Sequence, residues 1–382
     1  MSNPAIQVIE SGMLTTVQDR GRIGYQRFGV PVSGAMDEFA LRVANVLAGN
    51  DQNAAALEIT VLGPRVRFLQ DTMIALTGGD LSPQINDEPA PMWKTVAVAR
   101  DSVLSFGAVQ DGTRAYLAIA GGIDVPVVMG SRSTYVKAGI GGHEGRPLKP
   151  GDVLSTLPSP HGSAFEPIAL PPGYIAPAYG GHHELRVVAG PQDDRFTAES
   201  LSTLLSARFS IGLDSDRMGY RLDGHKLSHV KGADIVSDGN APGAIQAPGD
   251  GRPMILLADR GTTGGYTKIA TVISTDLSKV AQALPGQTVS FKTITVEAAH
   301  QIYRERESIF AALRRMVVPP RLKVTIGRDV YEVVDEGGDA VGHVSLNGST
   351  TTSRSRRVTA KVQGQSYEFE VEVHREEEAG GP

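Results

Sequence analysis

Three polar stretches of the sequence place charged residues, glycines and hydroxyl groups where strands are expected to turn. Arginine and lysine side chains and the N–H groups of turns stabilise negative charge on oxygen or hold a carboxylate or phosphate, and a carboxylate accepts a proton. The candidate catalytic residues are Asp216, Arg217, Asp259, Arg260 and Lys268. The candidate substrate-binding residues are Asp19, Arg20, Arg22, Tyr25, Asp37, Gln246, Thr263 and Gly264. Taken together, these residues indicate a functional site.

Each of these features also has a purely structural interpretation. An Asp–Arg pair in a β-turn can tie two loops together without doing chemistry. Tyr25 and Tyr220 fit barrel packing as well as ligand contact, because buried tyrosines are common. Glu58 lies in a predicted strand, where an unpaired carboxylate is costly to bury, so we expect it to brace an arginine.

Other chemical motifs are absent or incomplete. The sequence contains no Walker loop, and the glycine-rich run Gly139–Gly145 leads into Arg146-Pro147 rather than into a helix, which argues against a dinucleotide loop. His225 and His229 stand four residues apart in a glycine-flanked segment without helical periodicity, so we predict no metal site. The Gly-Thr-Thr-Gly-Gly run at 261–265 lacks the serine that an amidase loop would use as its nucleophile.

The composition excludes several classes of partner and chemistry. The 382 residues include 37 Lys plus Arg against 42 Asp plus Glu, a formal charge of −5, so no basic surface is expected for nucleic acid or for an anionic membrane. With no cysteine, the chain has no disulfide, thiolate nucleophile or cysteine-ligated metal. The start lacks a signal-peptide pattern and no segment has the apolar length of a membrane span, so we expect a cytoplasmic protein.

Short apolar runs separated by turn residues predict a mainly β fold. The 44 glycines and 23 prolines lie between Val-, Ile- and Leu-rich runs of strand length, which favours barrels or sandwiches. Helical periodicity predicts only a few helices. We expect them from a Ser33 cap to Leu47, after Asp193-Asp194, over residues 275–284 and over residues 296–317.

The two halves of the chain show weak internal repetition, which predicts two related β units in tandem. Asp19-Arg20 with Gly24-Tyr25 corresponds to Asp216-Arg217 with Gly219-Tyr220 in the same order. The predicted domains are residues 1–175, residues 176–318 with a C-terminal helix, and a small β-rich appendage at 321–382 beyond Pro319-Pro320.

Several of these motifs resemble a known family. Together they are similar to the signatures of the allophanate hydrolase subunit 2 family over roughly residues 12–318, a family that includes the C subunit of 5-oxoprolinase and a carboxyltransferase subdomain of urea carboxylase. The resemblance implies two tandem cyclophilin-like β-barrels with a few helices. The stretches that carry it are Gln18–Gln26, Gly29–Asp37, Gly130–Tyr135, Asp214–Arg221, Pro242–Gly251 and Ala258–Lys268.

The resemblance implies chemistry at an amide N–C=O group, carried out with partner proteins. The leading hypothesis is a component of ATP-dependent 5-oxoprolinase that is similar to the C subunit of that enzyme. One alternative is a carboxyltransferase subunit that moves a carboxyl group from carboxybiotin to urea or a related amide, and another is a regulatory partner-binding protein without catalysis. Prolyl isomerase activity rests on the cyclophilin-like fold alone and ranks last.

The resemblance also implies partners and cofactors. The expected partner is a smaller protein of the subunit 1 type or the B-subunit type, joined by the A subunit of 5-oxoprolinase or by a biotin carboxylase and carrier. The biotinylation sequence Ala-Met-Lys-Met is absent, so no cofactor is expected to be bound covalently, and ATP or carboxybiotin would act through the partner subunits. The segment Val362–Glu372 resembles a strand that often precedes a biotin carrier domain.

Overall fold

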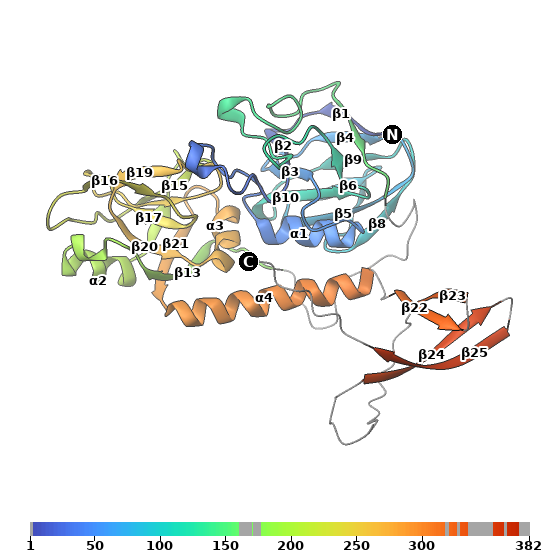
Figure 1. Cartoon of the computed structure of the whole chain (residues 1–382). Helices are drawn as coiled ribbons and strands as arrows, with labels where there is room; N and C mark the ends of the chain where they lie inside the picture. The colour runs from blue at the N-terminus through green and yellow to red at the C-terminus, as the bar shows by residue number, and fades with distance from the viewer. Residues whose placement is uncertain are drawn as a thin grey trace, which may run out of the picture. The chain divides into compact units, whose positions relative to one another are not determined.

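The computed structural model of the chain describes residues 3–159, 170, 177–317, 321–326, 329–334, 354–362 and 365–373, with side chains described only as far as Leu313. Contacts divide the chain into two units, Met1–Leu313 and Arg314–Pro382. Both expected β halves belong to the first unit (Figure 1). The predicted boundaries at 175/176 and at Pro319-Pro320 lie outside the described residues.

The first half consists of two antiparallel sheets packed around one apolar core. Ile6, Phe68, Ile74 and Leu117 in this core are fully buried, as expected for strands that alternate apolar side chains toward one face. One sheet has the order β11-β12-β1-β4-β9-β6-β7, with bounds Ile123–Asp124, Val153–Thr156, Asn3–Glu10, Arg65–Phe68, Val103–Phe106, Pro83–Ile85 and Glu88–Pro89. The other has the order β2-β3-β10-β5-β8, with bounds Leu14–Gln18, Ala56–Thr60, Asp111–Ile119, Thr72–Asp80 and Thr95–Val98.

The second half is a closed barrel around its own core, so the prediction of a mainly β, barrel-type fold is confirmed. All strand pairs in it are antiparallel except β13 with β21. The barrel order is β13-β20-β17-β18-β15-β14-β21, with bounds His182–Ala189, Lys268–Val272, Ala244–Gln246, Met254–Leu256, Gly219–Asp223, Phe209–Ile211 and Thr288–Thr293. A separate ribbon pairs β16 (Asp234–Gly239) with β19 (Thr263–Tyr266).

The α-helices are few, as predicted, although the first three begin later than expected. Their bounds are α1 Glu38–Leu47, α2 Ala198–Ser206, α3 Leu277–Gln282 and α4 Val296–Val317, and the short 3-10 helices are η1 Gln26–Phe28, η2 Val136–Ala138, η3 Asp193–Arg195 and η4 Ser274–Asp276. The helix expected after Asp193-Asp194 begins at Ala198, because Thr197 caps it by accepting from the Ser200 N–H at 3.2 Å. The fourth helix has the predicted bounds.

The prediction that Ser33 caps α1 is wrong. The cap is Asp37, whose Oδ1 accepts a hydrogen bond from the Ala40 N–H at 3.0 Å. An aspartate here also places negative charge at the helix N-terminus, where the backbone N–H groups are unpaired. Ser33 lies four residues upstream in a left-handed conformation, with φ 55°, so it belongs to the loop before the helix.

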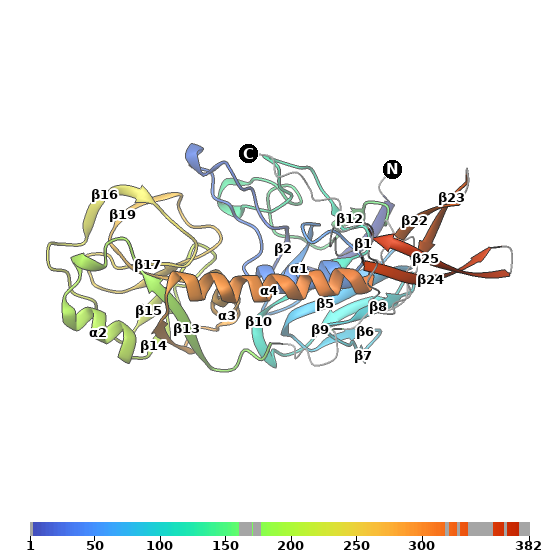
Figure 2. The same ribbon diagram turned by 60° about the horizontal axis from the view of Figure 1, so that its bottom comes forward.

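Helix α4 follows the last barrel strand and lies beside α1 of the first half (Figure 2). Arg42 of α1 donates from Nη1 and Nη2 to the two carboxylate oxygens of Glu307, at 2.7 and 2.6 Å. The same guanidinium lies 3.6 Å from the ring centroid of Phe310, which is itself buried. A bidentate ion pair and a cation–π contact therefore hold α4 against the first half.

The second unit contains two antiparallel hairpins, in agreement with the predicted β-rich appendage. Strand β22 (Arg321–Ile326) pairs with β23 (Asp329–Val334), and β24 (Arg354–Val362) pairs with β25 (Gln365–Val373). Within the described part of the chain, no helix has the length and apolar character needed to cross a membrane.

The ion pair between Arg146 and Asp152, in the loop before β12, is expected to make a pH-dependent contribution to stability. Hydrogen bonds from Arg146 lower the pKa of Asp152 from its ordinary 3.8 to about 2. A depressed folded-state pKa stabilises the fold above the unfolded-state pKa, and this contribution is lost as the pH falls from about 4 toward about 2. We expect Asp152→Asn to lower the free energy of unfolding by about 1 kcal/mol at pH 7. Urea titrations would show this difference shrinking toward zero as the pH falls toward about 2, and an equal difference at both pH values would contradict the assignment.

Candidate functional site

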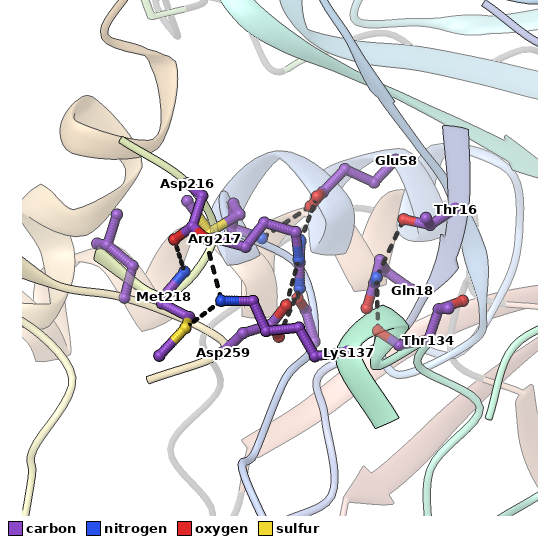
Figure 3. A network of polar contacts seen from close by, with 12 residues as sticks. Thr16, Gln18, Glu58, Thr134, Lys137, Asp216, Arg217, Met218 and Asp259 are labelled. Atoms are coloured by element: carbon purple, nitrogen blue, oxygen red, sulfur yellow. Dashed lines mark hydrogen bonds and ion pairs between the residues drawn. The ribbon is translucent and has the colours of Figure 1, made fainter. Parts of the chain in front are cut away.

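The two halves of the first unit meet at a buried ion pair centred on Arg217 (Figure 3). The Arg217 Nη1 donates to Glu58 of β3, its Nε donates to Asp259 Oδ2 at 2.9 Å, and its Nη2 donates to the Gly34 carbonyl at 2.6 Å. The side chains of Arg217, Glu58 and Asp259 are at most 9% exposed. Removing any one of these charges would leave a buried charge without its counter-ion. The expectation that Glu58 braces an arginine is confirmed.

Glu58 extends this contact into the first half. Its Oε2 accepts from the Met36 N–H at 2.8 Å and from the Tyr116 hydroxyl at 2.7 Å. The Tyr116 oxygen in turn accepts from the Asp37 N–H at 2.8 Å, so the start of α1 is tied to Arg217 through two side chains. Burial raises the pKa of Asp37, whose Oδ2 accepts from Gln282 of the second half at 2.9 Å.

A second set of buried contacts joins β10 to α3. Arg114 donates from Nη1 to the Tyr220 hydroxyl at 2.7 Å and to the Ala281 carbonyl. The Gln282 Oε1 accepts from the Thr113 and Arg114 N–H groups at 2.9 and 2.8 Å. Tyr220 is therefore a packing residue that also accepts a buried hydrogen bond, and these contacts join the two halves, although the Arg114 Nε has no hydrogen-bond partner in the described chain.

Asp19 and Arg22 organise a loop of the first half. Both Asp19 oxygens are used: Oδ1 accepts from the hydroxyls of Ser131 and Ser133 at 2.7 and 2.5 Å, and Oδ2 accepts from the Arg132 N–H at 2.6 Å. Arg22 is fully buried and donates from Nη2 to the Ser133 carbonyl. Burial lowers the pKa of Arg22, and its Nε and Nη1 have no hydrogen-bond partner among the described residues.

A polar rim of the second half brings together candidate residues from β17, β19 and β20. Gln246 and Lys268 are cross-strand partners, so their side chains lie on the same face. The Lys268 side chain is 3% exposed, and its Nζ has no hydrogen-bond partner within the described chain, since the Asp238 Oδ2 lies 3.7 Å away. The Gln246 Nε2 donates to the Asn240 Oδ1 at 2.9 Å. A buried amine without a hydrogen bond is costly and points to a ligand oxygen.

Two further residues shape this rim. A Cβ atom at Gly264 would meet the Gln246 Nε2 at 2.7 Å and the Asn240 Nδ2 at 2.9 Å, so only glycine leaves these amides in place. The Arg260 Nε donates to the Asn240 carbonyl at 2.9 Å and its Nη1 donates to the Leu257 carbonyl at 3.1 Å. Burial lowers the pKa of Arg260 to about 10.

The sequence-predicted residues thus fall into separate groups. Gln246, Arg260, Gly264 and Lys268 lie at the rim, and Thr263 stands beside Gly264 on β19. Arg217, Asp259 and Asp37 lie in the interface between the halves, and Asp19 and Arg22 lie around the 131–133 loop.

Three predicted residues are accessible. Asp216 is exposed and pairs with Lys137 at 3.2 Å, Arg20 pairs with Glu38 at 3.0 Å, and Tyr25 is half-buried before η1 (Figure 3 shows the Asp216–Lys137 pair).

Sequence reasoning missed two rim residues, Asp238 and Asn240. They belong to a Ser-Asp-Gly-Asn run that reads as an ordinary polar turn. The available signal was their position a few residues before the Pro242–Gly251 stretch.

The fold and this rim define a class of β-rich protein with two joined halves and a polar site carried by barrel strands and the turns beside them. The sequence matches the family described as carboxyltransferase domain, subdomain A and B, over residues 28–293, and the chain belongs to this family.

Similar proteins agree with this assignment. The chain is 38% identical over 308 residues to the C subunit of 5-oxoprolinase from Escherichia coli (strain K12), covering 81% of this chain and 97% of that protein. It is 38% identical over 332 residues to urea amidolyase of Lachancea kluyveri, covering 81% of this chain but 18% of that protein. The solved K. lactis urea amidolyase superposes with TM-score 0.77 at 35% identity, over 82% of this chain and 20% of that one. These relatives are components of enzymes.

Proposed function

We propose that this chain is the component of an ATP-dependent 5-oxoprolinase that corresponds to its C subunit. The observation that carries the proposal is coverage: the match spans 97% of the E. coli 5-oxoprolinase protein, whereas it spans 18% of the Lachancea urea amidolyase at the same 38% identity. A second 5-oxoprolinase C subunit, from Haemophilus influenzae, is matched over 98% of its length at 34% identity.

In this proposal the rim residues act on the cyclic amide of the substrate. The Lys268 Nζ donates to the amide oxygen as negative charge develops there, because a buried cation without a hydrogen-bond partner, only 3.7 Å from the Asp238 carboxylate, can stabilise an oxyanion. Asp238, whose side chain is 56% exposed beside Lys268, accepts a proton from the attacking water and returns one to the ring nitrogen as the C–N bond breaks. Gln246 and Arg260 hold Asn240 and the rim in place.

The remaining candidate residues support this rim from the interface. Arg217 and Asp259 hold the second half against Glu58, and Asp37 holds α1 against Gln282. We assign them a positioning role, since their polar atoms are occupied by protein partners.

ATP is assigned to partner proteins of the A and B types. The cavity between the two halves has a volume of ≈ 130 Å³, below the roughly 300–1,000 Å³ of pockets that hold drug-sized ligands, and so does not fit a nucleotide. The chain is therefore proposed to work only in an assembly.

A second candidate function is carboxyl transfer from carboxybiotin to urea or a related amide. It is favoured by the family description and by the TM-score of 0.77 with the solved urea amidolyase. The biotin would be carried outside these 382 residues, which contain no Ala-Met-Lys-Met sequence.

Avidin separates the two functions in one experiment. The chain is purified with its neighbouring subunits, and ATP hydrolysis is measured with 5-oxoproline or with urea and bicarbonate, each with and without avidin. We expect 5-oxoproline to stimulate ATP hydrolysis equally with and without avidin, because ring opening uses no biotin. If urea and bicarbonate stimulate ATP hydrolysis and avidin abolishes this stimulation, the carboxyltransferase function is favoured instead.

A further inference from the structure

A cavity lies between the two halves of the first unit; Lys268 is not among its lining residues, although the cavity shares Arg260 with the rim. Its lining comes from the loop before α1, from the segment around Leu257–Arg260, from η4 and α3, and from one turn of α4. Loop, barrel and α4 thus converge on one partly open cavity of ≈ 130 Å³.

The charged groups that line this cavity are mainly positive. They are Arg20, Arg260, Arg306 and Glu38, which leaves two positive charges in excess. Glu38 binds Arg20 at 3.0 Å, and no ion pair joins it to Arg260 or Arg306 among the described residues. Burial lowers the pKa of both Arg260 and Arg306, although the charges of Glu38 and Glu307 partly oppose this effect at Arg306.

Two polar atoms of the lining lack protein partners. The Ser33 Oγ belongs to a residue that is 4% exposed, and it makes no hydrogen bond with any described residue. The Arg306 Nε is buried and equally without an acceptor in the described chain, although its Nη1 donates to the Ser274 carbonyl at 3.3 Å. Ser33 is also held at φ 55°, a strained conformation that often marks a functional position.

We infer that this cavity is a binding site for a small oxyanion, a carboxylate or a phosphate. Arg260 and Arg306 supply the positive charge, and Ser33 supplies a hydroxyl donor, which is the donor set that such anions require. The volume of ≈ 130 Å³ suits a small anion. Because the site joins both halves and α4, a bound anion would also stabilise the first unit.

The inference is tested by thermal unfolding of the full-length chain with increasing sodium phosphate or sodium acetate, at ionic strength held constant with chloride. We expect Tm to rise and to saturate with at least one of the two anions, because a ligand that binds only the native state stabilises it. Arg306→Gln and Arg260→Gln are each expected to weaken the apparent affinity by about tenfold or more, the loss of one charge-assisted hydrogen bond. Ser33→Ala, which removes only the hydroxyl, is expected to weaken it less.

The matched control is Arg304→Gln, an exposed arginine on the same helix that contacts Gln301, and it is expected to keep the full response. Circular dichroism of each variant establishes that it is folded, and Ser33→Ala keeps the test available if an arginine variant unfolds.

A Tm that follows ionic strength alone, or equal responses of the Arg306 and Arg304 variants, would overturn the site. The result is independent of turnover, so the oxoprolinase proposal and this site can fail separately. A response to acetate alone identifies a carboxylate site, and a response to phosphate alone identifies a phosphate site.

Discussion

Replacement of Arg217 by methionine is expected to lower the free energy of unfolding by about 3–5 kcal/mol, the usual cost of removing one partner from a buried ion pair. The change leaves the carboxylates of Glu58 and Asp259, which are 1% and 6% exposed, without their counter-ion. It also removes the hydrogen bond to the Gly34 carbonyl. Because these contacts join the two halves, activity of the assembly is expected to be lost with stability.

Urea denaturation measures the effect, and Arg221→Met is the matched control. Arg221 lies on β15 near Arg217, but its side chain is 36% exposed and its partner Asp214 is 53% exposed. An exposed pair contributes about 0–1 kcal/mol, so the control is expected to unfold almost like the native chain. Adding Glu58→Gln and Asp259→Asn to Arg217→Met is expected to recover part of the loss, since it removes the stranded charges. Equal stability of the two single variants would refute the central role of Arg217.

Replacement of Lys268 by methionine is expected to reduce turnover by about 100-fold or more while leaving stability unchanged or increased. The loss corresponds to removing one donor to a developing oxyanion. Stability is not expected to fall, because the buried Nζ has no hydrogen-bond partner in the described chain and methionine fills a similar volume without a polar atom.

A loss of turnover without a loss of stability would distinguish a catalytic role of Lys268 from a structural one. A residue with a structural role alone would lose stability and activity together when changed. Lys292→Met, at an exposed position on β21, is the control and is expected to alter neither property. Unchanged turnover in Lys268→Met would remove this residue from the proposed mechanism, and the turnover number at saturating substrate is the quantity to compare.

Much of the architecture could be predicted because it follows from local pattern. Helix α4 could be placed at residues 296–317 from its apolar periodicity, and the strand-length runs indicated the mainly β class. The start of α1 was predicted wrongly, because both Ser33 and Asp37 are good caps by residue type. Only the positive φ of Ser33, imposed by the surrounding loop, decides between them.

The candidate site was only partly predictable, because it depends on contacts between distant residues. Arg217 and Glu58 are 159 positions apart, and no local pattern says which buried carboxylate meets which arginine. Asp–Arg neighbours in the sequence do not pair with each other: Arg217 binds Asp259, while Asp216 binds Lys137. The burial of the Lys268 amine, and its lack of a hydrogen-bond partner in the described chain, follow from the closure of the barrel and could not be predicted from local sequence.

The most direct test of the proposed function is ATP-dependent loss of 5-oxoproline, measured in the complete assembly and in the same assembly without this chain. We predict loss of 5-oxoproline only when the chain is present, and restoration when the purified chain is added back. Equal loss without the chain, or no loss in the complete assembly while urea is carboxylated, would contradict the proposed function. Silence in both assays would favour a regulatory, partner-binding role.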